Sequence, residues 1–146
     1  MKKIILTSLI VFSTLLAQAD VVGTWKTIDD ETGEPKSLVS IFRDGDQVKG
    51  KIIELLNPKE PDPKCDKCPG DKKDQPIVGL EILWGLKGAQ DAKEWSGGQI
   101  LDPNNGKTYK CRLRLLEDGS KLEVRGFIGF SLIGRSQTWV RQADSP

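Results

Sequence analysis

Residues 107–116 read KTYKCRLRLL, and apolar and polar side chains alternate along most of this stretch. Successive side chains of an extended chain point to opposite faces, so a period of two predicts a β-strand with one buried face. The apolar face carries Tyr109, Cys111, Leu113 and Leu115, and the other face carries Thr108, Lys110, Arg112 and Arg114. Cys111 is therefore predicted to be a small buried hydrophobe and not a reactive thiol.

Similar short runs of β-branched, aromatic and leucine residues fill the chain from residue 21 onward, without a sustained helical period. Turn sequences such as Asp44-Gly45-Asp46 and Glu117-Asp118-Gly119-Ser120 separate them and favour antiparallel neighbours. The predicted strands are 21–28, 37–43, 47–56, 79–85, 95–101, 107–116, 121–128 and 135–141.

Each of these strands must bury its apolar face, either in a sandwich or in a closed barrel. A closed up-and-down barrel leaves no exposed strand edge. The sequence therefore predicts an all-β domain, an eight-stranded antiparallel up-and-down barrel.

The first nineteen residues have the three-part order of a secretory signal peptide. Lys2 and Lys3 precede an uncharged, mostly apolar run over residues 4–16, and Ala17-Gln18-Ala19 provides small residues for cleavage. The apolar run is shorter than the roughly twenty residues of a membrane-spanning helix. We expect cleavage after Ala19, leaving one domain over residues 20–146 that works outside the cytoplasm and is not inserted in a membrane.

The charge balance is nearly neutral, with 22 basic and 21 acidic residues. A nucleic-acid-binding protein would show a basic excess gathered on one face, so this class is not expected. Five lysines of the segment 57–78 lie among acidic residues and are predicted to form a solvated surface of mixed charge: Lys59, Lys64, Lys67, Lys72 and Lys73.

Catalysis is not expected, because the chain contains no histidine to serve as the usual base. Ser131 is expected to lie in a loop, and Asp102 is expected to cap a turn through its own side chain. Two facing carboxylates would be the remaining route to an enzyme. No metal site and no cofactor are predicted.

Cys65 and Cys68 lie in a proline-rich segment with no helix after them. In an exporting compartment thiols tend to oxidise, so a disulfide between these two residues is the favoured prediction. Metal binding and redox chemistry are the alternatives, although a zinc site requires four ligands.

Gly23-Thr24-Trp25 matches the Gly-x-Trp pattern with which lipocalins begin their barrel. Further segments resemble a family of bacterial exported proteins that is classed as a domain of unknown function and described as lipocalin-like. These segments are 50–52, the Cys65-x-x-Cys68 loop, 95–103, 106–111, 124–129 and 134–139. The resemblance implies a lipocalin-like (calycin) barrel and a periplasmic location, but no activity.

In lipocalins a basic residue late in the last strand packs across the first tryptophan, and Arg135 and Arg141 are the two candidates here. Trp25 and Arg141 are predicted to close the barrel. Trp84, Trp95 and Trp139 suit either a core or a pocket. If Trp139 faces inward, Arg135 and Gln137 share its face, and an inward arginine needs a partner such as an anionic ligand.

The favoured function is a periplasmic protein that binds a small apolar or amphipathic molecule, anionic ones included, without catalysis. The predicted ligand-binding residues, at the barrel mouth, are Trp84, Tyr109, Arg135, Gln137 and Trp139. The alternative is a structural or protein-interaction module of the cell envelope, whose barrel is filled by side chains and whose Cys65–Cys68 loop contacts a partner protein.

Overall fold

The structure is a computed structural model that describes residues 10–11, 19–89, 91–130 and 132–143. The predicted signal peptide, residues 1–19, therefore lies almost entirely outside the described residues, as does Ser131. No helix among the described residues is long and apolar enough to cross a membrane.

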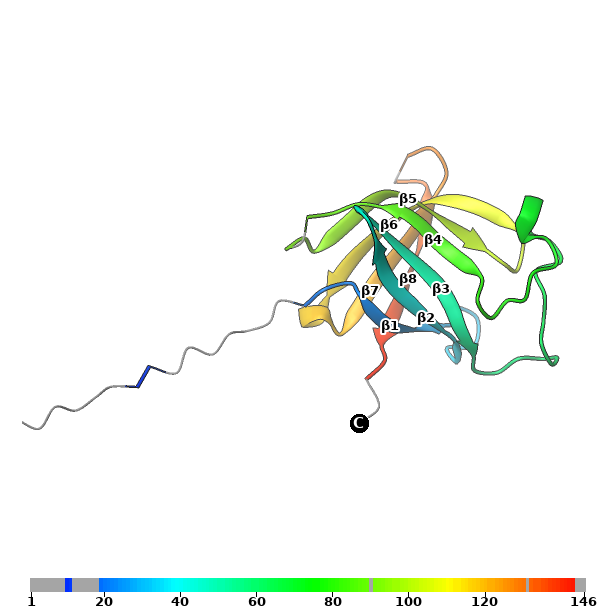
Figure 1. Cartoon of the computed structure of the whole chain (residues 1–146), viewed down its shortest axis with the longest axis horizontal. Coiled ribbons are helices and arrows are strands. Elements are labelled where there is room, and N and C mark those ends of the chain that lie inside the picture. The colour runs from blue at the N-terminus through cyan, green and yellow to red at the C-terminus, as the bar shows by residue number, and fades with distance from the viewer. Residues whose placement is uncertain (1–9, 12–18, 90, 131, 144–146) are drawn as a thin grey trace, which may run out of the picture.

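Eight antiparallel strands form a closed barrel in which each strand pairs with the next along the chain and β1 pairs with β8 (Figure 1). The all-β prediction is confirmed, and every predicted strand boundary falls within about two residues of the observed one. The strands are β1 (Gly23–Ile28), β2 (Pro35–Asp44), β3 (Gln47–Leu55), β4 (Glu81–Leu86), β5 (Glu94–Asp102), β6 (Lys107–Leu116), β7 (Lys121–Phe127) and β8 (Gly134–Arg141).

The barrel interior is filled by the apolar faces that the alternation predicts. On β6, Cys111, Leu113 and Leu115 are buried, while Arg112 and Arg114 between them are not. Trp25 and Trp95 are completely buried and Trp139 is almost so. Large aromatic side chains bury more apolar area than any others, so three of them supply much of the core.

The connections between strands alternate between the two ends of the barrel, as an up-and-down topology requires. The Trp25 end comprises residues 19–22 and the connections 45–46, 87–93 and 117–120. The Asp30 end comprises the connections 29–34, 56–80, 103–106 and 128–133. The longest connection, 56–80, and an apolar hairpin tip, 128–133, therefore belong to the same end.

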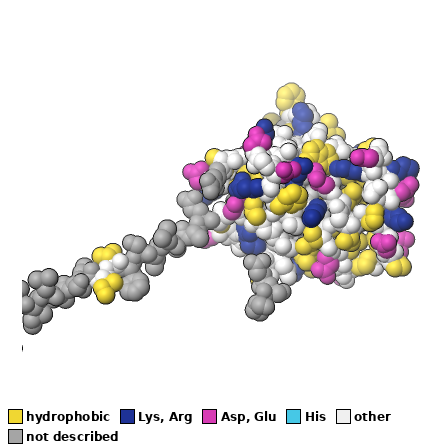
Figure 2. Space-filling view, in the orientation of Figure 1, with side chains coloured by type: hydrophobic (Ala, Val, Ile, Leu, Met, Phe, Trp, Pro, Cys, Tyr) yellow, Lys and Arg dark blue, Asp and Glu magenta, His cyan; other side chains and the backbone are white. Residues whose placement is uncertain are grey.

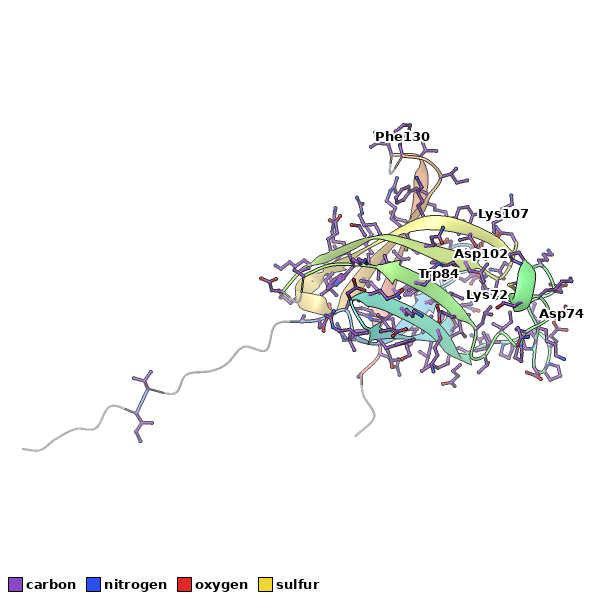
Figure 3. All side chains as sticks on the ribbon, turned by 45° about the horizontal axis from the view of Figure 1, so that its top comes forward. Lys72, Asp74, Trp84, Asp102, Lys107 and Phe130 are labelled. Carbon is purple, nitrogen blue, oxygen red and sulfur yellow. A yellow bond between two sulfur atoms is a disulfide. The ribbon has the colours of Figure 1, made fainter. Side chains whose placement is uncertain are left out.

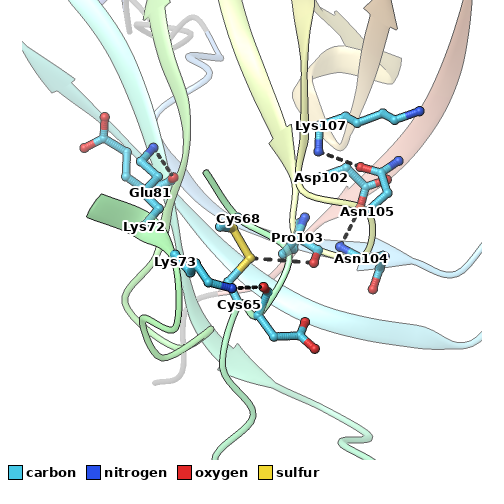
Figure 4. Close-up of a disulfide and its surroundings, with 11 residues drawn as sticks. Cys65, Cys68, Lys72, Lys73, Glu81, Asp102, Pro103, Asn104, Asn105 and Lys107 are labelled. Atoms are coloured by element: carbon cyan, nitrogen blue, oxygen red, sulfur yellow. Dashed lines mark hydrogen bonds between the residues drawn. A yellow bond between two sulfur atoms is a disulfide. The ribbon is translucent and has the colours of Figure 1, made fainter. Parts of the chain in front are cut away.

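Cys65 and Cys68 form a disulfide, as predicted, with Cα atoms 5.4 Å apart. Both residues are buried, and Cys65 Sγ lies 3.7 Å from the carbonyl oxygen of Pro103 in the β5–β6 turn (Figure 4). In the same turn, Gly106 approaches the backbone of Lys67 so closely that no Cβ atom would fit. The part of the 56–80 connection around this disulfide, residues 63–77, which we call the disulfide segment, is thus packed against the Asp30 end.

Candidate functional site

The interior face of β8 carries four of the residues singled out from the sequence. Arg135, Gln137 and Trp139 pair with Gly126, Val124 and Leu122 of β7, and Arg141 pairs with Trp25 of β1. Residues opposite each other on paired strands share a face, and Leu122 and Val124 are buried in the core. Trp139 is buried, and Arg135 and Gln137 share its face of β8, as predicted for an inward Trp139. The Arg135 side chain at the end of this face is 72% exposed.

Arg141 closes the Trp25 end of the barrel. Its guanidinium carbon lies 4.2 Å from the centre of the Trp25 ring. The guanidinium donates to the carbonyl oxygens of Gly119 (2.7 Å), Val22 (3.2 Å) and Asp20. The predicted packing of this arginine across the first tryptophan is therefore present.

Arg135 and Gln137 lie at the other end of β8, where an aspartate of the β1–β2 connection meets them. Asp30 Oδ2 lies 3.2 Å from Arg135 Nη2 and accepts from Gln137 Nε2 at 2.8 Å. Gln137 Oε1 in turn accepts from the indole nitrogen of Trp139 at 3.2 Å. We call this chain of contacts the Asp30 bridge, and it gives Arg135 an anionic partner from within the protein.

Tyr109 is half-buried on the inward face of β6, opposite Ile100 of β5. Its hydroxyl accepts a hydrogen bond from Asn105 Nδ2 at 3.0 Å. Tyr109 lies on the interior face near the Asp30 end, where Asp30 contacts Gln137 and where the sequence predicted the mouth of a ligand site.

Trp84 lies on the other side of the sheet. Leu83 beside it is completely buried, whereas the Trp84 indole nitrogen donates to the exposed Gln99 side chain at 2.9 Å. The five residues predicted to bind ligand are therefore not one cluster: Tyr109, Arg135, Gln137 and Trp139 belong to the interior face, and Trp84 belongs to the exterior.

Strand pairing continues from Trp84 across four strands on the outer face. Trp84 pairs with Gln99, Gln99 with Lys110, and Lys110 with Phe127. Paired residues point to the same face, so these side chains form one row, which we call the outer row. Neighbouring strands lie about 4.8 Å apart, so the row spans about 14 Å.

A groove of about 390 Å³ follows the outer row. Its remaining lining is Gly85, Gly97, Gly98 and Cys111, and Cys111 is itself buried with its side chain inward. A Cβ atom built on Gly97 would meet no atom within 4 Å, so this glycine leaves open space beside the outer row. The groove therefore has walls from Trp84 and Phe127 and a floor that is largely backbone.

Two lysines accompany the outer row. Lys72 Nζ lies 4.0 Å from the centre of the Trp84 ring and donates to the carbonyl oxygen of Glu81 at 3.1 Å (Figure 3). Lys110 Nζ donates to the carbonyl oxygen of Gly129 at 3.4 Å. Lys72 is half-buried, and its contact with Trp84 is one that the prediction of a solvated surface of mixed charge did not include.

Burial raises the pKa of the Cys111 thiol to about 12, so this cysteine is neutral at ordinary pH. The expectation that Cys111 is buried is confirmed. Among the described residues no three histidine, cysteine, aspartate or glutamate side chains are placed to hold a metal ion. Asp102 accepts from the backbone nitrogen of Asn104, the predicted turn cap.

Comparison with known proteins supports the fold independently. Residues 23–141 match the family model described as "Uncharacterized protein conserved in bacteria (DUF2147)". The chain belongs to this family. No match was found among curated proteins.

A solved structure extends the comparison for this member of the DUF2147 family. It is protein HP1028 from the human pathogen Helicobacter pylori, which is described as belonging to the lipocalin family. The TM-score is 0.75 at 20% sequence identity, and the match covers 86% of this chain and 85% of the other. The likeness shows that this DUF2147 chain has a lipocalin-like barrel.

Sequence reasoning missed Asp30, Lys72, Gln99, Lys110 and Phe127 as site residues of this DUF2147 protein. The alternation in residues 107–116 does place Lys110 on the polar face, but only strand register lines it up with Gln99 and Phe127. Trp84 follows Ile82 and Leu83, and three consecutive apolar residues do not show which side faces the core.

Proposed function

We propose that this protein is exported to the periplasm, where it binds a small amphipathic molecule without catalysing a reaction. We further propose that the ligand lies in the outer groove and has an apolar body and an anionic group. The observation that carries this proposal is the groove itself, about 390 Å³ in volume, with aromatic walls and flanking lysines.

The walls suit an apolar body. Ligand sites in proteins usually measure about 300–1,000 Å³ and are mainly apolar, with a few polar groups that fix orientation. Trp84 and Phe127 stand at the two ends of the outer row, and the glycine backbone between them allows close approach. Gln99, held by the Trp84 indole, presents an amide between the two rings.

The lysines suit an anionic group. Lys72 and Lys110 both bond to backbone carbonyl oxygens at surface positions, so their ammonium groups retain further donors. A carboxylate or phosphate near either ammonium would accept a charge-assisted hydrogen bond. At the barrel mouth, by contrast, Asp30 already contacts Arg135 and Gln137. This contrast favours the groove over the barrel mouth for the anionic group.

Export and the absence of catalysis rest on the chain itself. Residues 1–19 have the order of a signal peptide, and a disulfide persists mainly in oxidising compartments. The sequence has no histidine, and the one cysteine outside the disulfide is buried with a raised pKa. A nucleophile activated by the usual base is therefore not available.

The test is isothermal titration calorimetry of the protein recovered after export, with dodecanoate as the anionic probe and dodecyltrimethylammonium as its charge-reversed counterpart. Trp84→Ala and Phe127→Ala should each weaken dodecanoate binding about tenfold, since each removes part of the apolar contact. Ile53→Ala, at an exposed apolar position on β3, is the matched control and should bind as the wild type does.

Gln137→Ala separates the two candidate sites. It alters the barrel mouth and leaves the outer row intact, so dodecanoate should bind it normally. If Gln137→Ala lost affinity for dodecanoate while Trp84→Ala and Phe127→Ala bound it normally, the ligand site would be at the barrel mouth, as predicted from the sequence. Equal affinity for both probes would remove the anionic part of the proposal.

The alternative, a structural or interaction module of the cell envelope, draws support from the tightly filled interior. The interior side chains of Trp25, Trp95, Leu113 and Leu122 are all completely buried. This function requires that a panel of amphiphiles causes no heat change, while crosslinking in intact cells traps a protein on the 57–80 connection.

A further inference from the structure

The tip of the β7–β8 hairpin, residues 128–133, exposes a cluster of large apolar side chains. Ile128 is 69% exposed, Phe130 77%, Leu132 91% and Ile133 66%. The sequence from Ile128 to Gly134, IGFSLIG, contains no charged residue. Figure 1 shows this hairpin projecting from the barrel, and Figure 3 places Phe130 at its tip. We call it the apolar hairpin.

The apolar hairpin is a folded element that presents these side chains outward. The backbone nitrogen of Ile128 donates to the carbonyl oxygen of Ile133 at 3.3 Å, and that of Ile133 donates to Phe130 at 3.0 Å. Lys110 Nζ of β6 donates a hydrogen bond to the carbonyl oxygen of Gly129 in the hairpin. Clustered exposed apolar groups of this kind mark sites that contact a protein or a membrane.

Basic side chains surround the base of the apolar hairpin. Lys110 pairs with Phe127, and Arg125 and Arg135 flank Gly126 on β7 and β8. Asp30 is the acidic side chain that contacts Arg135 there. In Figure 2 yellow apolar atoms form the upper tip of the molecule, and both dark blue basic groups and magenta acidic groups lie below it.

We propose that the apolar hairpin docks the protein on a membrane surface that contains anionic phospholipids. Apolar side chains would enter the boundary between headgroups and acyl chains, while Lys110, Arg125 and Arg135 would lie at the level of the phosphates. This pairing of an apolar tip with a basic base is the charge complementarity that an anionic bilayer offers. The hot spots of protein–protein interfaces, in contrast, are rich in tryptophan, tyrosine and arginine and poor in leucine, so the composition of this hairpin favours a lipid surface.

Docking goes beyond the proposed ligand binding and stands without it. Phe127 lines the outer groove and directly precedes Ile128, so a docked protein holds the groove beside the lipid surface. An amphipathic ligand would then exchange between groove and membrane over a short path.

The test is co-sedimentation of the protein recovered after export with vesicles of phosphatidylcholine, alone or mixed with phosphatidylglycerol. The wild type should sediment with the mixed vesicles and lose about fivefold in partition for each contacting basic residue when phosphatidylglycerol is omitted. Phe130→Ser combined with Leu132→Ser should lower partition on the order of tenfold or more. Mass spectrometry of every sample establishes that all variants have the same N-terminus.

The matched control is Ile53→Ser combined with Val140→Ser, which removes two exposed apolar side chains outside the hairpin, the second near the Trp25 end. Its partition should stay within about twofold of the wild type, as expected for surface substitutions. Phe130→Trp in a Trp84→Phe background gives a second readout. Brominated lipid should quench the new indole and hardly reach the three remaining tryptophans, Trp25, Trp95 and Trp139, which are buried in the core.

Three results would overturn docking: a wild type that stays in the supernatant with mixed vesicles, a Phe130–Leu132 double variant that sediments normally, or a Phe130→Trp variant whose added fluorescence brominated lipid leaves unchanged. Docking would also be overturned if a photocrosslinker at position 132 captured a protein in intact cells and the protein did not bind vesicles. The hairpin would then be a site for a protein partner. The double variant should still bind dodecanoate, and Trp84→Ala should still sediment, so the two proposals fail separately.

Discussion

Arg135 and Arg141 lie on the same face of the same strand, one at each end of the barrel, and their surroundings differ completely. Arg141 stacks on the buried ring of Trp25 and donates to three backbone carbonyl oxygens from two segments, 19–22 and 117–120. Arg135 is mostly exposed and contacts one carboxylate, that of Asp30. The same residue type thus closes one end of the barrel and only borders the other.

The comparison shows where this fold leaves room for function. At the Trp25 end a cation, a ring and backbone carbonyl groups satisfy one another, so a ligand would have to displace structural contacts. At the Asp30 end the long connection 56–80 and the apolar hairpin extend beyond the barrel, and the outer row begins beside them. Loops that extend from a rigid barrel commonly carry function.

The largest expected effect comes from Arg141→Ala. This change removes the cation above Trp25 and leaves the carbonyl groups of Gly119, Val22 and Asp20 without that donor, so the free energy of unfolding should fall by roughly 2–4 kcal/mol. Arg135→Ala removes an exposed ion pair and should cost about 1 kcal/mol or less. Urea denaturation monitored by tryptophan fluorescence measures both values.

Arg141→Lys sharpens this experiment, because lysine keeps the charge but not the planar guanidinium fork. It should recover only part of the loss. Equal losses for Arg135→Ala and Arg141→Ala would mean that the two ends of the barrel are equivalent, and the comparison would no longer hold.

The fold could be predicted because its signals are local. Alternation in residues 107–116 defines one buried face, and turn sequences such as Asp44-Gly45-Asp46 set the strand count. The closure of the barrel by Trp25 and Arg141 came from a resemblance, and the observed 4.2 Å stacking agrees with it. Cys111 was placed correctly by the same alternation.

The candidate site could not be predicted because it depends on contacts distant in sequence. Asp30 meets Gln137 across more than a hundred residues, and Lys72 reaches Trp84 only because the disulfide segment folds back over β4. The position of Trp84 depends on the local geometry around Gly85, whose φ of 72° interrupts the simple alternation of β4. Amino-acid composition does not show where a strand has an irregularity of this kind.

The second effect in size concerns the disulfide segment. Cys65→Ser combined with Cys68→Ser should lower the free energy of unfolding by roughly 2 kcal/mol, the value expected for a very short loop. A reducing agent should cause a similar loss in the wild type and none in the double variant, which is the internal control. Hydrogen exchange should increase at the Ile77 and Asp74 amides, which bond within this segment.

A reductant that leaves stability and exchange unchanged would mean that packing against Pro103 and Gly106 holds the segment without the disulfide. The loss should stay confined to the Asp30 end, so that the amides around Gly119 and Arg141 exchange as in the wild type. Faster exchange at both ends would show that the ends are coupled, contrary to the comparison.

The smallest expected effect comes from Asp30→Ala, which removes the Asp30 bridge. Only exposed contacts to Arg135 and Gln137 are lost, and Gln137 can still accept from Trp139, so the free energy of unfolding should fall by about 1 kcal/mol or less. The Gly33 amide, in the same connection, should exchange faster. Asp30→Asn keeps an oxygen for Gln137 and should behave between Asp30→Ala and the wild type.

Asp30→Ala also decides which region of the molecule binds dodecanoate. The variant frees the Arg135 guanidinium from its carboxylate and loosens the connection over the barrel mouth, while the outer row stays as it is. A ligand in the outer groove should therefore bind Asp30→Ala with unchanged affinity. Tighter binding would mean that Asp30 had competed with the ligand for Arg135, and would return the site to the mouth of the barrel.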